Sequence, residues 1–342
     1  MKKILIILLA VVMVSCQPNN IINETVDKSS IENQEESIKQ EETTQEEITV
    51  EDFIYTYASK EEAALILASE DDYIVQLSAF DYASKFNSTQ ALDYDGRLAV
   101  YRHNTLEWRD DQKAVVDKAM INVTAYLEAM EITIPHISFA LTSIADEGGA
   151  AYTRQNMIVL KPHHVSVYSQ GLEDLILHEF FHIYSRMNKE LRPAMYAIIG
   201  YQTCDPLIPP DQIKDLMISN PDAPDNNFYI TGLYQGENLS FIPIIYSSEA
   251  YEIDSGRSFF ETLNDDMLGV TIVNGKPEVI LNDGQLLIVK KEEIEDFYDK
   301  VGRNTSYTYH PEETMADNFV FLAKNMTVRD MHILEELKKV LK

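Results

Sequence analysis

The fold is decided by a stretch in the middle of the chain, Leu175-Ile176-Leu177-His178-Glu179-Phe180-Phe181-His182-Ile183-Tyr184. It lies in a strongly helical segment, residues 172–187, which follows Gly171 and ends a few residues before Pro193. Within this stretch every position that flanks the run from His178 to His182 is uncharged, whereas a solvated helix would carry charge there. The sequence therefore predicts a buried helix that presents two histidines and a glutamate.

His178 and His182 are four residues apart, so both imidazoles lie on one face of the helix and can bind the same zinc ion. Glu179 lies beside them, where a carboxylate can take a proton from a metal-bound water. The pattern arises by chance in on the order of one to two per cent of chains with this composition, which makes it informative but insufficient. The alternative is a pair of core histidines with ordinary hydrogen-bond partners.

A catalytic zinc has three protein ligands, and the third must come from elsewhere in the chain. Asn188 stands where a metzincin has its third histidine. The best candidates lie in the run Tyr309-His310-Pro311-Glu312-Glu313-Thr314-Met315-Ala316-Asp317. Glu313 and Asp317 are one helical turn apart and share a face. Glu312 is the rival ligand, but its neighbour one turn on is Ala316, which has no carboxylate to orient a histidine. A solvated acidic helix start remains the alternative.

Together the two runs resemble the gluzincin class of metallopeptidases, which is thermolysin-like. The resemblance implies that His178, His182 and Glu313 bind Zn²⁺. It implies that Glu179 is the general base and that Asp317 orients His178 through the second ring nitrogen. The resemblance covers two short helices, and the gap between His182 and Glu313 is longer than in typical members of the class.

The remaining pattern predicts an α+β fold, which the resemblance makes zincin-like. It consists of a small mixed sheet packed on the histidine-bearing helix, additional helices and a β-hairpin insertion. Helices are expected as a hairpin between residues 53 and 86, and over 110–130, 292–301 and from 311 onward. Strands are expected over 137–141, 150–160, 270–273, 278–281 and 285–289, and residues 201–226 are expected to form a long irregular surface excursion.

Two weaker candidates complete the predicted site. The strand that begins Ala150-Ala151-Tyr152-Thr153 precedes the histidine-bearing helix, where zincins have an edge strand that pairs with an extended peptide. An ordinary strand is the alternative. A developing oxyanion needs a hydrogen-bond donor, and Tyr309 or His310 could supply it.

The N-terminus has the features of an exported protein. Two lysines precede an apolar run that ends at Val14, which predicts a secretory signal over residues 1–15. The sequence Met13-Val14-Ser15-Cys16 resembles the lipobox of bacterial lipoproteins, which implies lipidation of Cys16, and Gln17 would favour the outer membrane in a Gram-negative cell. Residues 16–50 are polar and acidic and predict a disordered tether. An extracytoplasmic, membrane-anchored metallohydrolase domain over residues 51–342 would follow. A secreted protein with an incidental cysteine is the alternative.

The amino-acid composition restricts the possible partners and metal ligands. The formal net charge of -28 argues against nucleic acid, because phosphate binding needs a basic face. With two cysteines in the chain, a cysteine-rich metal site is excluded, so the ligands must be histidines and carboxylates.

The leading hypothesis is hydrolysis of a peptide or protein substrate by zinc-activated water, with Glu179 as general base. Two alternatives stay open: a non-catalytic metal-binding surface lipoprotein, and an amidase that acts on cell-wall peptides by the same chemistry.

Overall fold

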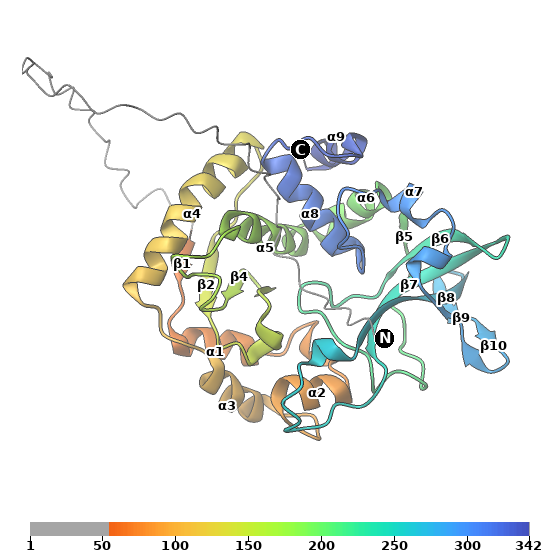
Figure 1. Cartoon of the computed structure of the whole chain (residues 1–342), viewed down its shortest axis with the longest axis horizontal. Coiled ribbons are helices and arrows are strands. Elements are labelled where there is room, and N and C mark those ends of the chain that lie inside the picture. The colour runs from red at the N-terminus through yellow and green to blue at the C-terminus, as the bar shows by residue number, and fades with distance from the viewer. Residues whose placement is uncertain (1–54, 342) are drawn as a thin grey trace, which may run out of the picture.

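The computed structural model describes residues 55–341. In this part of the chain helices and sheets are mixed, which confirms the α+β class (Figure 1). The predicted signal of residues 1–15, the lipidation site at Cys16 and the tether of residues 16–50 lie outside the described residues. Between residues 55 and 341 no helix is both long and apolar enough to cross a membrane.

The elements follow one another in a mixed order. The helices are α1 (Lys60–Ala68), α2 (Ala79–Phe86), α3 (Tyr94–Asn104), α4 (Asp110–Ala129), α5 (Leu172–Met187), α6 (Arg192–Ala197), α7 (Phe297–Val301), α8 (Pro311–Ala323) and α9 (Met331–Val340). The strands are β1 (Tyr55–Tyr57), β2 (Ile137–Leu141), β3 (Tyr152–Arg154), β4 (Met157–Leu160), β5 (Tyr201–Thr203), β6 (Phe228–Tyr234), β7 (Glu237–Ser247), β8 (Leu263–Val273), β9 (Lys276–Val279), β10 (Leu281–Asn282), β11 (Gln285–Leu286) and β12 (Ile288–Val289).

The first sheet has the order β1-β2-β4-β3. Its first three strands are parallel, and β3 runs antiparallel to β4 at the edge, so the predicted small mixed sheet is confirmed. The single strand expected over residues 150–160 is wrong, because the chain reverses at Gln155, whose φ is 54°. Strand β1 was not predicted, since three residues are too few to show a period of two.

Helix α5 begins and ends where the sequence predicts. Gly171 precedes it with a φ of 78°, a conformation that suits glycine. The apolar side chains of α5 pack into the main core on α8 and the first sheet. Ring centroids lie 5.9 Å apart between Phe180 and Phe319 and 5.5 Å apart between Phe181 and Phe319. The contact between α5 and α8 is therefore the rigid base on which any site between them is built.

The insertion between α5 and α8 is a second sheet and not the β-hairpin that the sequence predicted. The hairpin exists, with Val273 opposite Lys276 across the Asn274-Gly275 turn, but it is one end of a six-stranded sheet. Strands β12, β8, β7, β6 and β5 follow in that order, all antiparallel. Strands β6 and β7 were not predicted. Pro243 lies inside β7, where a proline argues against a central strand. In Figure 1 this sheet lies at the right of the view, beyond the end of α5, whereas the first sheet lies at the left.

Two helical predictions and one strand prediction need correction. The expected hairpin before residue 86 is wrong, because α1 packs on α3, a helix the sequence did not predict. Helix α3 has weak apolar periodicity because it buries Arg97, which donates hydrogen bonds to the carbonyls of Ala68 and Leu92. The helix expected over residues 292–301 is limited to α7, with one 3-10 turn before it, and the strand expected over 285–289 is split between β11 and β12.

Replacement of Phe319 by alanine tests the contact between α5 and α8. The ring is fully buried against Phe180 and Phe181, so we expect Phe319→Ala to lower the free energy of unfolding by about 3–5 kcal/mol. Urea denaturation in the presence of a chelator measures the change. Tyr168→Ala, at a side chain that is 90% exposed, should stay within about 0.5 kcal/mol of wild type. A loss for Phe319→Ala below about 1 kcal/mol would contradict this packing.

Candidate metal centre

The three predicted ligands converge between two helices. Helix α5 provides His178 and His182, and α8 provides Glu313. One ligand atom from each lies within 4.8 Å of the others, a spacing at which they could hold one metal ion. The Nε2 of His178 is 3.1 Å from Oε2 of Glu313, and the Nε2 of His182 is 3.5 Å from the same oxygen.

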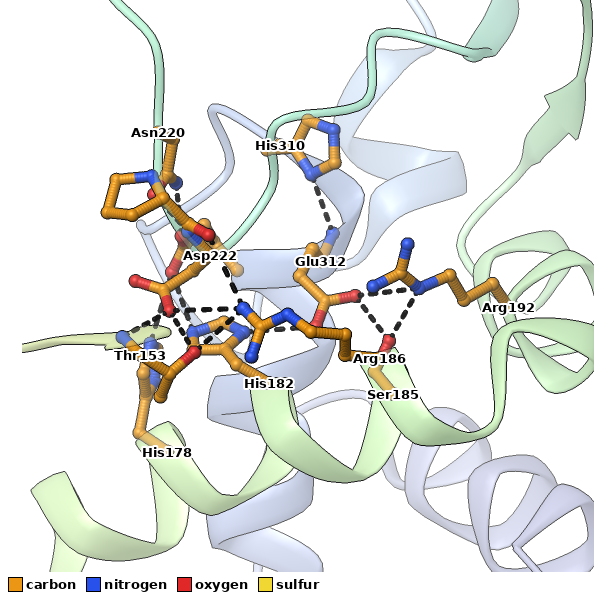
Figure 2. Close-up of polar contacts among 12 residues, drawn as sticks. Thr153, His178, His182, Ser185, Arg186, Arg192, Asn220, Asp222, His310 and Glu312 are labelled. Carbon is orange, nitrogen blue, oxygen red and sulfur yellow. Dashed lines mark hydrogen bonds and ion pairs between the residues drawn. The ribbon is translucent and has the colours of Figure 1, made fainter. Parts of the chain in front are cut away.

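Both histidines are held from behind by carboxylates of α8. Oδ1 of Asp317 lies 3.0 Å from Nδ1 of His178, which is the contact that the resemblance implies for Asp317. Oε1 of Glu312 lies 3.0 Å from Nδ1 of His182 (Figure 2). Such partners fix the ring orientation and leave the Nε2 lone pair free for a metal.

Sequence reasoning missed this role of Glu312, which it treated as a rival ligand. The carboxylate is buried, and Oε2 accepts hydrogen bonds from the hydroxyls of Ser185 and Tyr196. Burial alone would raise the pKa of Glu312, but its hydrogen bond with His182 and the charges of His182 and Arg192 bring it below its ordinary value. Glu312 is therefore an anion committed to holding His182. Two successive glutamates on a helix opposite two histidines are the signal that could have found it.

Unsatisfied polar atoms remain at the centre of the site. Oε2 of Glu179 and Nε2 of His182 are buried and make no hydrogen bond within residues 55–341. Buried polar atoms without partners are rare and indicate a water or an ion. Burial, with Asp222 nearby, raises the pKa of Glu179 to about 8. The residues present therefore fit a bound cation with an adjacent base.

The protein without metal holds protons at this site. Burial alone would lower the pKa of His178, but hydrogen bonds with Asp317 and Glu313 raise it to about 10. Burial opposes the charge of His182 too, yet Glu313 and Asp222 raise its pKa well above the ordinary value. A metal ion must displace these protons, because only a neutral imidazole binds it.

Asp222 is a site residue that the sequence did not indicate. Ligand atoms of Glu179, His182 and Asp222 form a second group within 4.8 Å, which shares His182 with the first. Asp222 belongs to the run Asn220-Pro221-Asp222-Ala223-Pro224, whose prolines and asparagine predict only a loop. Its pKa is raised, first by burial and then by Glu313. No local pattern marks an aspartate that reaches a site from a loop.

Of the two predicted hydrogen-bond donors, His310 is not in position. Its Nδ1 accepts the backbone N–H of Glu312 at 3.1 Å and caps α8 (Figure 2), and its ring also bonds the backbone of Asp225. Burial lowers the pKa of His310 to about 4, so the ring is neutral. Both ring nitrogens are thus committed, and the predicted contribution of His310 to the site is corrected to helix capping.

Tyr309 lies nearer the centre and brings in a residue that the sequence did not suggest. Its hydroxyl donates a hydrogen bond to the hydroxyl of Tyr307, whose ring centroid is 5.8 Å from that of His178. Burial and the charge of Glu313 raise the pKa of both tyrosines well above the ordinary value, so both remain protonated donors at neutral pH.

The comparisons with known proteins give no relative: no protein-family model, no curated protein and no solved structure matches this chain. The interpretation of the site therefore rests on its own geometry and chemistry.

Proton release on metal binding tests the electrostatics of the site. Because the pKa values of His178 and His182 are raised, both rings are imidazolium cations, protonated on both nitrogens, at pH 7.5 in the metal-free protein. We expect binding of Zn²⁺ to release about two protons, measured by calorimetry in two buffers of different ionisation enthalpy. Affinity should keep rising as the pH goes from 6.5 toward 10. His178→Ala should release fewer protons, whereas His136→Ala, at an exposed histidine, should match wild type. Affinity that levels off near pH 7 would contradict the raised pKa values.

Proposed function

We propose that this chain is a zinc-dependent peptidase of the gluzincin type, with a zincin-like fold, that cleaves peptide or protein substrates. The observation that carries the proposal is the convergence of three ligand-type side chains near Glu179, whose buried Oε2 has no hydrogen-bond partner within residues 55–341. A purely structural metal site has no use for a base beside its ligands, whereas hydrolysis requires one.

The donor set supports zinc. Two imidazole nitrogens and one carboxylate, from His178, His182 and Glu313, are ligands that zinc accepts in catalytic sites. Three protein ligands would leave the fourth position of a tetrahedral ion for water or substrate. The backing of both histidines by carboxylates supports the same assignment, because ligating histidines in zinc enzymes usually have such partners.

Each side chain then has a separate task in the reaction. Zinc would polarise the substrate carbonyl and lower the pKa of a water molecule. Glu179 would accept the proton of that water and return it to the leaving amine. Asp317 and Glu312 would accept the Nδ1 proton of each imidazole and hold the ring with Nε2 directed at the ion.

The Tyr307–Tyr309 pair is the best candidate for the oxyanion donor. Tyr307 accepts the hydrogen bond from Tyr309, so its own hydroxyl proton is available to a substrate oxygen near His178. Tyr309 would act by holding Tyr307, which modifies the direct role expected from the sequence.

Two other functions remain as alternatives because they would use the same residues. An amidase acting on cell-wall peptides would need the same centre, and a lipid anchor at Cys16 would hold it at the membrane outside the cytoplasm. A non-catalytic metal-binding lipoprotein would leave Glu179 without a task, and for that reason we rank it below hydrolysis.

Replacement of Glu179 and Glu313 separates catalysis from metal binding. We expect Glu179→Gln to keep stoichiometric zinc and to lose at least about a hundredfold in kcat, because only the proton acceptor is removed. Glu313→Ala should lose zinc, since two histidines alone bind it weakly. Metal content by mass spectrometry and cleavage of a peptide library measure the two effects.

Glu190→Gln is the matched control, because Glu190 is exposed just beyond α5. It should keep both zinc and activity. Absence of zinc from wild type would refute the proposal. Wild-type activity in Glu179→Gln would refute the role of the base, and stoichiometric zinc in Glu313→Ala would move the third ligand elsewhere.

A further inference from the structure

Residues 219–225, which we call the strap, cross the candidate metal centre. Two polar side chains of the strap point toward the centre (Figure 2). The Asn220 side-chain amide donates a hydrogen bond of 2.5 Å to Oε1 of Glu313. The carboxylate of Asp222 lies with Glu179 and His182 in the second group of ligand-type atoms. Asp222 therefore occupies the side of His182 that faces the base.

The strap also occupies the free hydrogen-bonding edge of β3. One side of β3 pairs with β4, and the backbone N–H of Thr153 faces the other side. Oδ1 of Asp222 accepts this N–H at 2.7 Å and the Thr153 hydroxyl at 2.5 Å. A peptide that adds to the edge of a sheet must accept the same N–H groups with its carbonyl oxygens. Asp222 thus stands where a substrate carbonyl would bind.

Buried charges anchor the first end of the strap. The carbonyl of Ser219 accepts a hydrogen bond of 2.7 Å from Nζ of Lys85, and its N–H donates to Asp81 at 3.2 Å. Lys85 is itself buried in ion pairs with Asp81 and Glu147. This end is fixed to α2, far in sequence from the centre.

The other end is held by α6, where Arg192 pairs with Asp225 at 3.4 Å. Arg186 of α5 donates a hydrogen bond of 3.3 Å to the carbonyl of Pro221, in the middle of the strap. Pro221 and Pro224 restrict the backbone between these anchors. The strap is thus a fixed segment that spans the site, and only its middle contacts the centre.

We infer that the strap is an internal blocking segment, in which Asp222 and Asn220 occupy the substrate position of the resting protein. Peptide hydrolysis requires the middle of the strap to leave β3 and Glu179, while its ends stay anchored. The substrate is then an extended peptide that replaces Asp222 on the Thr153 N–H. This inference rests on the proposed function.

Removal of the Asp222 carboxylate tests the block. If the open state is a minor fraction of the protein, Asp222→Ala should raise kcat/KM for an extended peptide by about tenfold or more while zinc is retained. Asp215→Ala is the matched control, because Asp215 is exposed in the same excursion of the chain. An unchanged or lower kcat/KM in Asp222→Ala with zinc retained would overturn the inference, because Asp222 would then assist the reaction or take no part in it.

A second measurement needs neither metal nor activity. Hydrogen exchange of the Thr153 amide in the metal-free full chain should be at least about tenfold faster in Asp222→Ala than in wild type, because the acceptor is gone. Asp222→Asn keeps an acceptor oxygen and should change exchange less. An equal exchange rate in wild type and Asp222→Ala would overturn the contact.

The two tests separate the two proposals. If wild type binds no zinc, the proposed function fails. Hydrogen exchange of the Thr153 amide still decides whether Asp222 of the strap binds the edge of β3. If Asp222→Ala does not fold, Asn220→Ala is tested in its place. This variant removes the hydrogen bond to Oε1 of Glu313 and should also raise kcat/KM. A decrease in kcat/KM for Asn220→Ala with zinc retained would overturn the block.

Discussion

The site depends on one arrangement, in which two carboxylates of α8 hold two histidines of α5 by their Nδ1 atoms. Asp317 holds His178 and Glu312 holds His182, each at 3.0 Å. With Nδ1 engaged, both Nε2 atoms face the third carboxylate, Glu313. A shift of α8 along α5 would break all of these contacts at once, so the packing of the two helices sets the chemistry.

Burial of these charged groups costs free energy of folding, and it also makes their pairing depend on correct geometry. Charged groups lose their hydration inside a protein, and pairing restores the loss only when the geometry is good. The aromatic contacts of Phe319 with Phe180 and Phe181 hold the two helices in register, and Lys324 adds an ion pair with Asp174 near the start of α5. The cation we propose would offset the remaining like charge among the buried carboxylates.

The site residues that lie within one helix could be predicted from the sequence, whereas those that reach the site from distant segments could not. The positions of His178, Glu179 and His182 on α5 follow from a helical period, and the one-turn spacing of Glu313 and Asp317 follows from the same geometry. Each of these could be predicted because the signal lies within one element. The small mixed sheet could be predicted for the same reason, apart from the strand β1 and the reversal at Gln155.

The rest depends on contacts between segments far apart in the chain. Asp222 reaches the centre from a loop whose composition indicates only a turn, and Lys85, which anchors that loop, lies more than a hundred residues earlier. The second sheet was predicted only at its hairpin, and its central strand β7 was missed because Pro243 breaks the expected pattern. Tertiary pairing outweighs local preference at these places, and a single sequence does not record that balance.

X-ray absorption at the zinc edge of the purified full chain tests the central claim most directly. The account predicts one zinc per chain with only nitrogen and oxygen ligands at about 2.0–2.2 Å and the scattering of two imidazole rings. His178→Ala should remove one of these ring contributions. A protein without bound zinc, or zinc with sulfur ligands or with no imidazole, would contradict the account.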